Sequence, residues 1–130
     1  MRNQFYIDYL VKLDPGLKKF VADQMLAHRG GFMAIPRRRL VGITASRHPE
    51  IKDIDRAVRK AIEDLRKDGW LIGMSQDGDG YFLITTPDEY EVFRSQYTDR
   101  AYKVIETAKK MDESARRVFA SDDVRQLSLI

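Results

Sequence analysis

The sequence contains no cysteine among its 130 residues. Disulfide bonds and thiolate metal sites within the chain are therefore excluded, and we expect the protein to act in the reducing cytoplasm. The sequence also lacks any run that approaches the roughly 18 uncharged apolar residues of a membrane span, so we expect no membrane partner. With 43% apolar and 33% charged residues, the chain can form the core of one globular domain.

Histidine is nearly as scarce, since only His28 and His48 are present. Neither has an evident carboxylate or thiol partner in the sequence. The segment DGDG at 77–80 is too short for a calcium loop, which needs about a dozen residues and a closing Glu. The segment RGGF at 29–32 lacks the lysine and serine of a phosphate-binding loop. We therefore expect no catalytic residue, no metal and no cofactor, and we do not expect an enzyme.

Positive charge is concentrated in one part of the chain. The whole chain has a net charge of +3, which by itself indicates little about partners. Residues 36–67 contain ten basic and five acidic residues, a net charge of +5, so the remainder of the chain is slightly negative. A partner that is attracted by positive charge is therefore expected to bind this segment.

Helix signals are frequent before residue 70. The segment FYIDYLVKL at 5–13 predicts a first helix. A second is expected with Asp14 as its N-cap, Pro15 in its first turn and a stop at Gly30. Residues 32–35 predict a short extended piece. A short helix is expected from Pro36 to Gly42, then a connection at 43–52 and a helix from about 53 to 69.

The second half of the sequence predicts a hairpin and then one long helix. The β-prone runs at 70–76 and 81–85 flank DGDG, which is typical of a hairpin. Thr86 has the features of an N-cap, Pro87 those of a first helical residue, and Glu89 completes a capping box. No Pro or Gly follows before about residue 120. The sequence therefore predicts a helix of over 30 residues, which is about 50 Å long.

This order of elements resembles a winged helix-turn-helix. The pattern R-x-x-I-x-x-L-R-x-x-G at 59–69 is followed by I-G at 72–73 and G-Y-x-L at 80–83, as is common in that family. Residues 17–85 are similar to small winged-helix proteins of phage and prophage genomes. The resemblance implies a mainly α protein with a small β-hairpin, in the α+β class. With the helix signals described above, the expected organisation is a winged-helix domain with an N-terminal helix at 1–86, a long helix at 87–120 and a flexible tail at 121–130.

The same resemblance implies binding to double-stranded DNA. In such folds the third helix presents its outer N-terminal half to the major groove, and a helix N-terminus favours contact with phosphates. The candidate DNA-binding residues lie at the start of the second helix of this fold and on or just before the third: Arg37, Arg38, Arg39, Lys52, Arg56, Arg59 and Lys60.

Acidic residues in the same region argue against DNA binding. Asp77 and Asp79 fall in the hairpin loop, where they would repel phosphates, and Asp53 and Asp55 open the third helix. We therefore expect the hairpin loop to contribute little to DNA binding. Charged residues on an amphipathic helix are also often only its solvated face, and winged helices also serve as protein-interaction modules. Both alternatives stay open at the level of sequence.

The long helix contains an apolar seam with heptad spacing. Its residues, with Tyr97 before them and Val118 after, are Ala101, Val104, Ala108, Met111 and Ala115. Steps of three and four residues are typical of a coiled coil, and alanine at every seventh position permits close helix approach. We expect the seam to pair with its copy in a coiled-coil homodimer. The alternative is that it packs on the N-terminal helix of the same chain.

The last five residues resemble a known peptide motif. Gln126, Leu127, Ser128, Leu129 and Ile130 are similar to the sliding-clamp-binding peptide of bacterial replication and repair proteins, Q-L-[S/D]-L-F, with Ile in place of Phe. The resemblance implies that the glutamine occupies a small polar site and that the final apolar residues fill a pocket on the bacterial sliding clamp. The alternative is that these apolar residues cover a patch on the protein itself or on a partner chain.

Together these patterns predict a non-enzymatic DNA-binding protein. We expect a phage or prophage replication accessory factor that binds DNA through its winged-helix domain and is tethered to the sliding clamp by its tail. One alternative is a transcriptional regulator with the same DNA-binding domain. Another is a protein-interaction module that occupies the clamp pocket without binding DNA.

Overall fold

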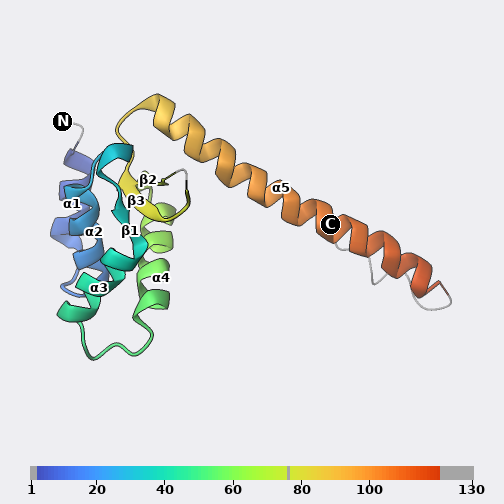
Figure 1. Ribbon diagram of the computed structural model, residues 1–130, viewed down its shortest axis with the longest axis horizontal. Helices are drawn as coiled ribbons and strands as arrows, with labels where there is room; N and C mark the ends of the chain where they lie inside the picture. Colours follow the sequence, from blue (N-terminus) through green and yellow to red (C-terminus); the bar gives the residue numbers. More distant parts are fainter. Residues whose placement is uncertain (1–2, 76, 121–130) are drawn as a thin grey trace. The chain divides into compact units, whose positions relative to one another are not determined.

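The structure is a computed structural model that describes residues 3–75 and 77–120 (Figure 1). The chain divides into two compact units, Met1–Glu91 and Val92–Ile130. The mainly helical class that the sequence predicts is confirmed, together with a small antiparallel sheet and a long C-terminal helix.

The elements follow one another with short connections. In chain order, the first unit contains α1 (Gln4–Lys12), α2 (Leu17–Ala27), the 3₁₀ helix η1 (Gly31–Met33), β1 (Ile35–Pro36), α3 (Arg37–Arg47), α4 (Ile54–Lys67), β2 (Ile72–Met74) and β3 (Gly80–Leu83). α5 (Pro87–Val118) begins at the end of this unit and forms the described part of the second.

The sheet has the order β1-β3-β2, and both pairs of neighbouring strands are antiparallel. The predicted hairpin of β2 and β3 is confirmed. The prediction missed the third strand: Ile35 in the extended piece pairs with Tyr81, and two paired residues are too few to be recognised in a sequence. Gly80 allows this close approach, because a Cβ atom there would lie 3.2 Å from the carbonyl oxygen of Ile35.

The core of the first unit is formed by α2, α3 and α4 together with the sheet (Figure 1). Its largest fully buried side chains are Trp70, Met25, Ile35, Leu40, Ile62, Leu65, Ile72, Leu83, Val21 and Val58. The apolar face of α4 accounts for four buried residues at helical spacing, which are Val58, Ala61, Ile62 and Leu65. The opposite face of α4 is thereby left to the solvent.

α1 is attached to this core through its aromatic residues. The ring of Tyr6 lies 4.6 Å from the ring of Trp70, measured between centroids, and Tyr6 is buried. The hydroxyl of Tyr9 donates a hydrogen bond to Asp68 at the end of α4. This bond, supported by Lys18, holds the pKa of Asp68 below its usual value. The buried side of α1 is therefore turned to α2 and Trp70.

The predicted start of α2 is wrong. Asp14 was expected as the N-cap and Pro15 in the first turn, but the helix begins at Leu17 with Gly16 as its N-cap. No side chain caps this end of the helix. Gly16 has a φ of 157°, far from helical values, and the chain turns there between α1 and α2. The pair Asp14-Pro15 therefore indicated that a helix follows but not the residue at which it begins.

The predicted end of α3 is also wrong. Gly42 was expected to stop this helix, yet α3 continues to Arg47. Thr44 is fully buried, and its hydroxyl donates to the carbonyl oxygen of Leu40 at 2.7 Å. Packing of this turn outweighs the roughly 1 kcal/mol that a glycine costs inside a helix. The helix ends just before Pro49, which disfavours helical geometry at His48.

The starts of α4 and α5 agree with the sequence. The carboxylate of Asp53 caps α4 by accepting from the N–H of Arg56 at 3.3 Å. The hydroxyl of Thr86 accepts from the N–H of Glu89 at 3.1 Å, as expected of an N-cap. From Pro87, α5 extends for 32 residues, about 48 Å at 1.5 Å per residue. None of its residues is buried.

Two absences hold for the part of the chain that the structure describes. No helix in it is long and apolar enough to cross a membrane. No group of three or more His, Cys, Asp or Glu residues in it is arranged to hold a metal ion.

Candidate nucleic-acid interface

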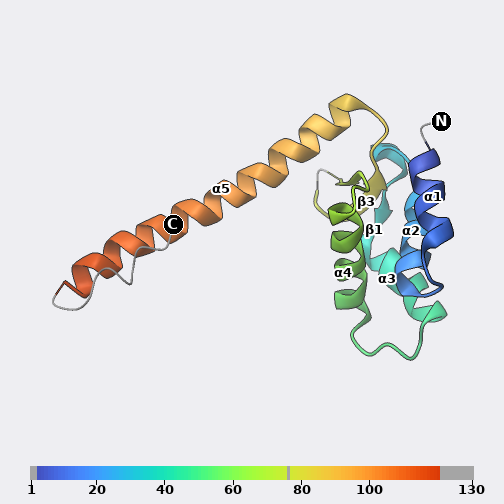
Figure 2. The ribbon, with the colours of Figure 1, turned by 180° about the vertical axis from the view of Figure 1, so that it is seen from behind.

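The predicted DNA-binding residues lie on neighbouring elements of the first unit. α3 and α4 pack against each other, and both views show them side by side (Figures 1 and 2). All seven side chains are exposed, and they form what is called here the basic surface: Arg37, Arg38 and Arg39 in the first turn of α3, Lys52 just before α4, and Arg56, Arg59 and Lys60 on α4. Asp55 contacts both Arg37 of α3 and Arg59 of α4, so the structure brings together residues that are 22 positions apart in the sequence.

Three cations of the basic surface are paired with carboxylates. Asp55 lies between two arginines: its Oδ1 is 3.7 Å from the Nε of Arg37, and its Oδ2 is 3.4 Å from the Nε of Arg59. Lys60 pairs with Asp64 one turn further along α4, at 3.1 Å. Sequence analysis found Asp55 only as an acidic residue at the start of a helix. Its pairing with Arg37 depends on how α3 meets α4, for which the sequence carries no signal.

The other four cations carry the unpaired charge of this surface. Among the described residues, the side chains of Arg38, Arg39, Lys52 and Arg56 form no hydrogen bond, ion pair or ring contact, since the bond of Arg56 to Asp53 uses its backbone N–H. Long basic side chains without partners keep their full charge available to a polyanion, and the release of condensed counterions favours such binding.

The loop between β2 and β3 is acidic and lies next to the start of α3. The carbonyl oxygen of Asp79 accepts from the N–H of Arg37 at 2.7 Å. The carboxylate of Asp77 accepts from the hydroxyl of Ser75 at 2.6 Å and from the N–H of Asp79 at 3.0 Å. These bonds, that of Ser75 above all, lower the pKa of Asp77 and keep it ionised. Negative charge therefore borders the basic surface on this side.

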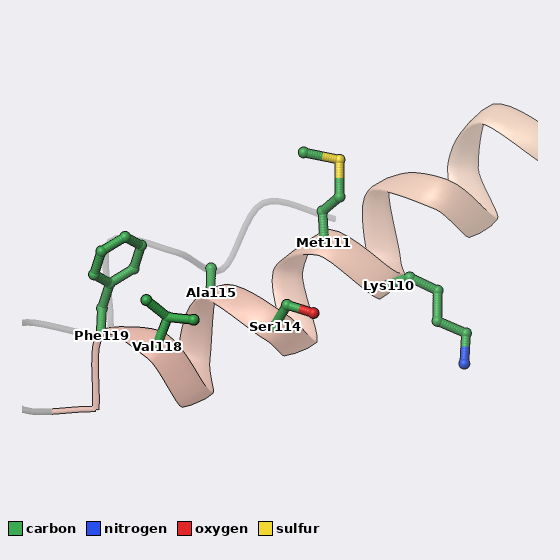
Figure 3. A pocket seen from close by; sticks show the side chains of 6 residues that line it. All are labelled: Lys110, Met111, Ser114, Ala115, Val118 and Phe119. Carbon is green, nitrogen blue, oxygen red and sulfur yellow. The ribbon is translucent and has the colours of Figure 1, made fainter.

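The apolar seam of α5 is open to solvent. Val104 is 69% exposed and Met111 67%, Ala101 is exposed, and Ala108 and Ala115 are partly exposed. Near the end of the helix, the seam runs into a shallow patch lined by Lys110, Met111, Ser114, Ala115, Val118 and Phe119. Figure 3 shows Met111, Ala115 and Phe119 on one side of the helix and Lys110 directed away from them. Met111 and Ala115, two of the predicted dimerisation residues, thus lie on the same side of α5.

The predicted clamp-binding residues, Gln126 to Ile130, lie outside the described residues. Comparison of the sequence with known proteins gave no match, whether with protein-family models, with curated proteins or with solved structures. A function for the basic surface is therefore argued from its own residues and contacts.

Proposed function

We propose that the protein is a non-enzymatic winged-helix protein that binds double-stranded DNA through its basic surface. The observation that carries this proposal is the set of exposed cations with unpaired side chains, which are Arg38 and Arg39 on α3, Lys52 just before α4 and Arg56 on α4. The order α2, β1, α3, α4, β2, β3 and the sheet order β1-β3-β2 support it, because they agree with the connectivity expected of a winged helix.

In this proposal, the outer face of α4 enters the major groove. Arg56 reaches base edges or phosphates from the first turns of α4, while Arg38 and Arg39 contact the phosphate backbone beside the groove. The acidic loop that contains Asp77 and Asp79 takes no part, because phosphates are repelled there. The contacts to phosphate position the protein, and those of α4 to base edges supply any sequence preference.

The proposal has two further parts, which concern partners. The apolar seam of α5 pairs with a second copy of the chain in a coiled-coil homodimer. Gln126 to Ile130 bind the bacterial sliding clamp, on the ground of their similarity to its peptide motif. With both contacts, the protein acts as a replication accessory factor of a phage or prophage.

A second candidate function is favoured by a specific observation. Three of the seven cations on the basic surface are already paired with Asp55 or Asp64, and the loop beside it stays negatively charged. Such a surface suits a mixed-charge protein partner better than a uniformly acidic polymer. The protein would then be an interaction module that occupies the clamp pocket without binding DNA.

The DNA-binding proposal is tested by removing two unpaired arginines. In the double variant Arg38→Ala/Arg56→Ala, we expect affinity for a 20-base-pair duplex to fall by about tenfold or more at low salt. The slope of log K against log salt should decrease by about 1 if Arg56 contacts base edges and by about 2 if it contacts a phosphate, one unit for each lost phosphate contact. Fluorescence anisotropy between 50 and 200 mM salt measures both quantities.

The matched control is Lys12→Ala/Lys109→Ala, which removes the same charge from α1 and α5. A retained salt slope in this control, beside a reduced slope in the arginine variant, localises the contact to α3 and α4. Equal losses in both variants would contradict a defined surface. A wild-type protein that does not bind the duplex at 50 mM salt would reject DNA binding and favour the interaction module.

A further inference from the structure

Asp55 holds together two arginines from different elements. Arg37 is in the first turn of α3, and Arg59 is one turn after Asp55 on α4. The two guanidinium groups contact different oxygens of the same carboxylate, at 3.7 and 3.4 Å. Their side chains are 49% and 54% exposed, and that of Asp55 is 42% exposed. The carboxylate therefore lies between two cations at the surface, where another anion from solution can replace it.

Neither helix needs this carboxylate for capping. Asp53, and not Asp55, accepts from the free N–H group of Arg56 at the start of α4. The N–H of Arg37 is already bonded to the carbonyl oxygen of Asp79. Ion pairs that are half exposed contribute little to stability, because water screens them and two long side chains lose freedom. A role for Asp55 in folding is thus small, and its position calls for another explanation.

We propose that the space between Arg37 and Arg59 is a seat for one backbone phosphate of duplex DNA, and that Asp55 fills it in the free protein. This inference rests on the DNA binding proposed above. A phosphate offers one oxygen to each of the two guanidinium groups, and hydrogen bonds from arginine to phosphate oxygens are charge-assisted and therefore strong. The carboxylate stands in for those oxygens until DNA arrives.

Replacement of the Asp55 carboxylate by a DNA phosphate costs little free energy. The ion pairs that Asp55 gives up are weak, and its side chain leaves the seat by rotating into solvent. The phosphate gains two charge-assisted bonds and releases condensed counterions. The carboxylate nevertheless competes with a backbone phosphate for the two arginines at every position along the DNA. It therefore lowers the affinity of the protein for the DNA backbone, whatever the sequence. Asp55 thereby limits non-specific binding. Base contacts from Arg56 then contribute a larger share of the total free energy of DNA binding.

The test is the variant Asp55→Asn, which keeps the shape of the side chain and removes its charge. We expect about fivefold to tenfold tighter binding to a duplex of random sequence at 50 mM salt. The salt slope should become steeper by about 1. The matched control is Asp64→Asn, which removes the same charge from the same helix but frees only Lys60. This control should tighten binding by less than about threefold.

A second variant shows whether the gain comes from the seat. In Arg37→Ala/Asp55→Asn one guanidinium of the seat is missing, so the tighter binding of Asp55→Asn should be lost. Thermal unfolding of each variant checks that all of them are folded. An equal gain in Asp55→Asn and Asp64→Asn would overturn the inference, because general electrostatics would then explain both.

Weaker binding by Asp55→Asn would overturn it as well, since the carboxylate would then itself contact the DNA. Both of these results leave the proposed function intact, because the wild-type protein binds the duplex in each. Absence of duplex binding in the wild type and in every variant would instead reject the proposed function and the phosphate seat together.

Discussion

Glu89 joins three segments of the first unit through one carboxylate. Its Oε1 accepts from the N–H and hydroxyl of Thr85, at 3.0 and 3.2 Å, and its Oε2 accepts from the N–H of Gly31 at 2.9 Å. Burial alone would raise the pKa of Glu89, but these donors together outweigh it and hold the pKa below the ordinary value of 4.5. The ionised form is therefore the one that stabilises the fold.

The sign of this effect gives a dependence on pH. A carboxyl group whose pKa is lower in the folded state contributes stability above its unfolded pKa and loses it as the pH falls through the folded value. We expect Glu89→Gln to reduce the free energy of unfolding by about 1 to 2 kcal/mol at pH 7. The difference from the wild type should shrink as the pH falls below the ordinary carboxyl pKa of 4.5. Urea unfolding at pH 7, 5 and 3.5 measures it.

The control for this prediction is Glu91→Gln, which changes an exposed residue two positions further along the same helix. It removes the same charge but none of the bonds to Gly31 and Thr85, so it should change stability by less than about 0.5 kcal/mol. A difference between wild type and Glu89→Gln that stays constant over the whole pH range would show that the ionised carboxylate is not responsible.

At the scale of the elements, the sequence predicted those with a strong periodic pattern. α4 has four apolar residues on one face, an N-cap at Asp53 and a glycine after its last turn, and these signals agree with one another. α5 has a Thr-Pro start and no later Pro or Gly until its end. Where several independent signals coincide, local preference and tertiary packing select the same structure.

The errors occurred where packing outweighs local preference. Gly42 is a weak helix former, but the turn after it buries Thr44, so α3 continues. β1 is only two residues long, and it exists because β3 offers it a free edge. The candidate site follows the same rule. Exposure of the arginines followed from the pattern, whereas the link from Asp55 to Arg37 required knowing how two helices meet.

The seam of α5 gives a prediction for this element. If it forms a homodimer, Ala108→Glu places a charge where two helices approach most closely. Burying an unpaired carboxylate costs on the order of 3 kcal/mol, which is roughly a hundredfold in the dimerisation constant. We expect the variant to sediment as a monomer at micromolar concentrations at which the wild type is a dimer.

The control variant for the seam is Lys109→Glu, which introduces the same side chain one residue further around the helix. Because Lys109 is exposed and outside the seam, the dimer should persist. Glu and Lys are both good helix formers, so α5 itself should be unaffected, and circular dichroism checks this. A wild-type protein that is monomeric at 100 μM would reject the seam as an interface.

At the scale of the whole molecule, the proposed function joins two weak contacts. Exposed arginines give an affinity for DNA that salt reduces steeply. A short peptide such as Gln126 to Ile130 has few anchors and is expected to bind a clamp weakly by itself. Once one contact has formed, the second takes place within the same complex, and the effective concentration of the partner rises to the millimolar range. The two contacts together then determine the residence time of the protein on DNA that carries a clamp.

This linkage predicts a specific loss in the variant that lacks residues 126–130. Its affinity for free duplex DNA should equal that of the full chain, because the basic surface is unchanged. Its binding to the bacterial sliding clamp should be abolished. On DNA that carries a loaded clamp, its residence time should fall by about a hundredfold, which is the contribution expected from joining two sites. Surface-immobilised DNA with and without the clamp separates these effects in one experiment.

The matched control keeps both contacts and changes only the distance between them. Ten Gly and Ser residues inserted between Ala120 and Ser121 should lower the residence time only a few-fold, since effective concentration falls slowly with linker length. If the shortened chain stays on clamp-loaded DNA as long as the full chain does, the C-terminal peptide does not tether the protein, and the clamp part of the proposed function is wrong. If it loses affinity for free duplex as well, those five residues contribute to DNA binding directly, and the two contacts are not independent.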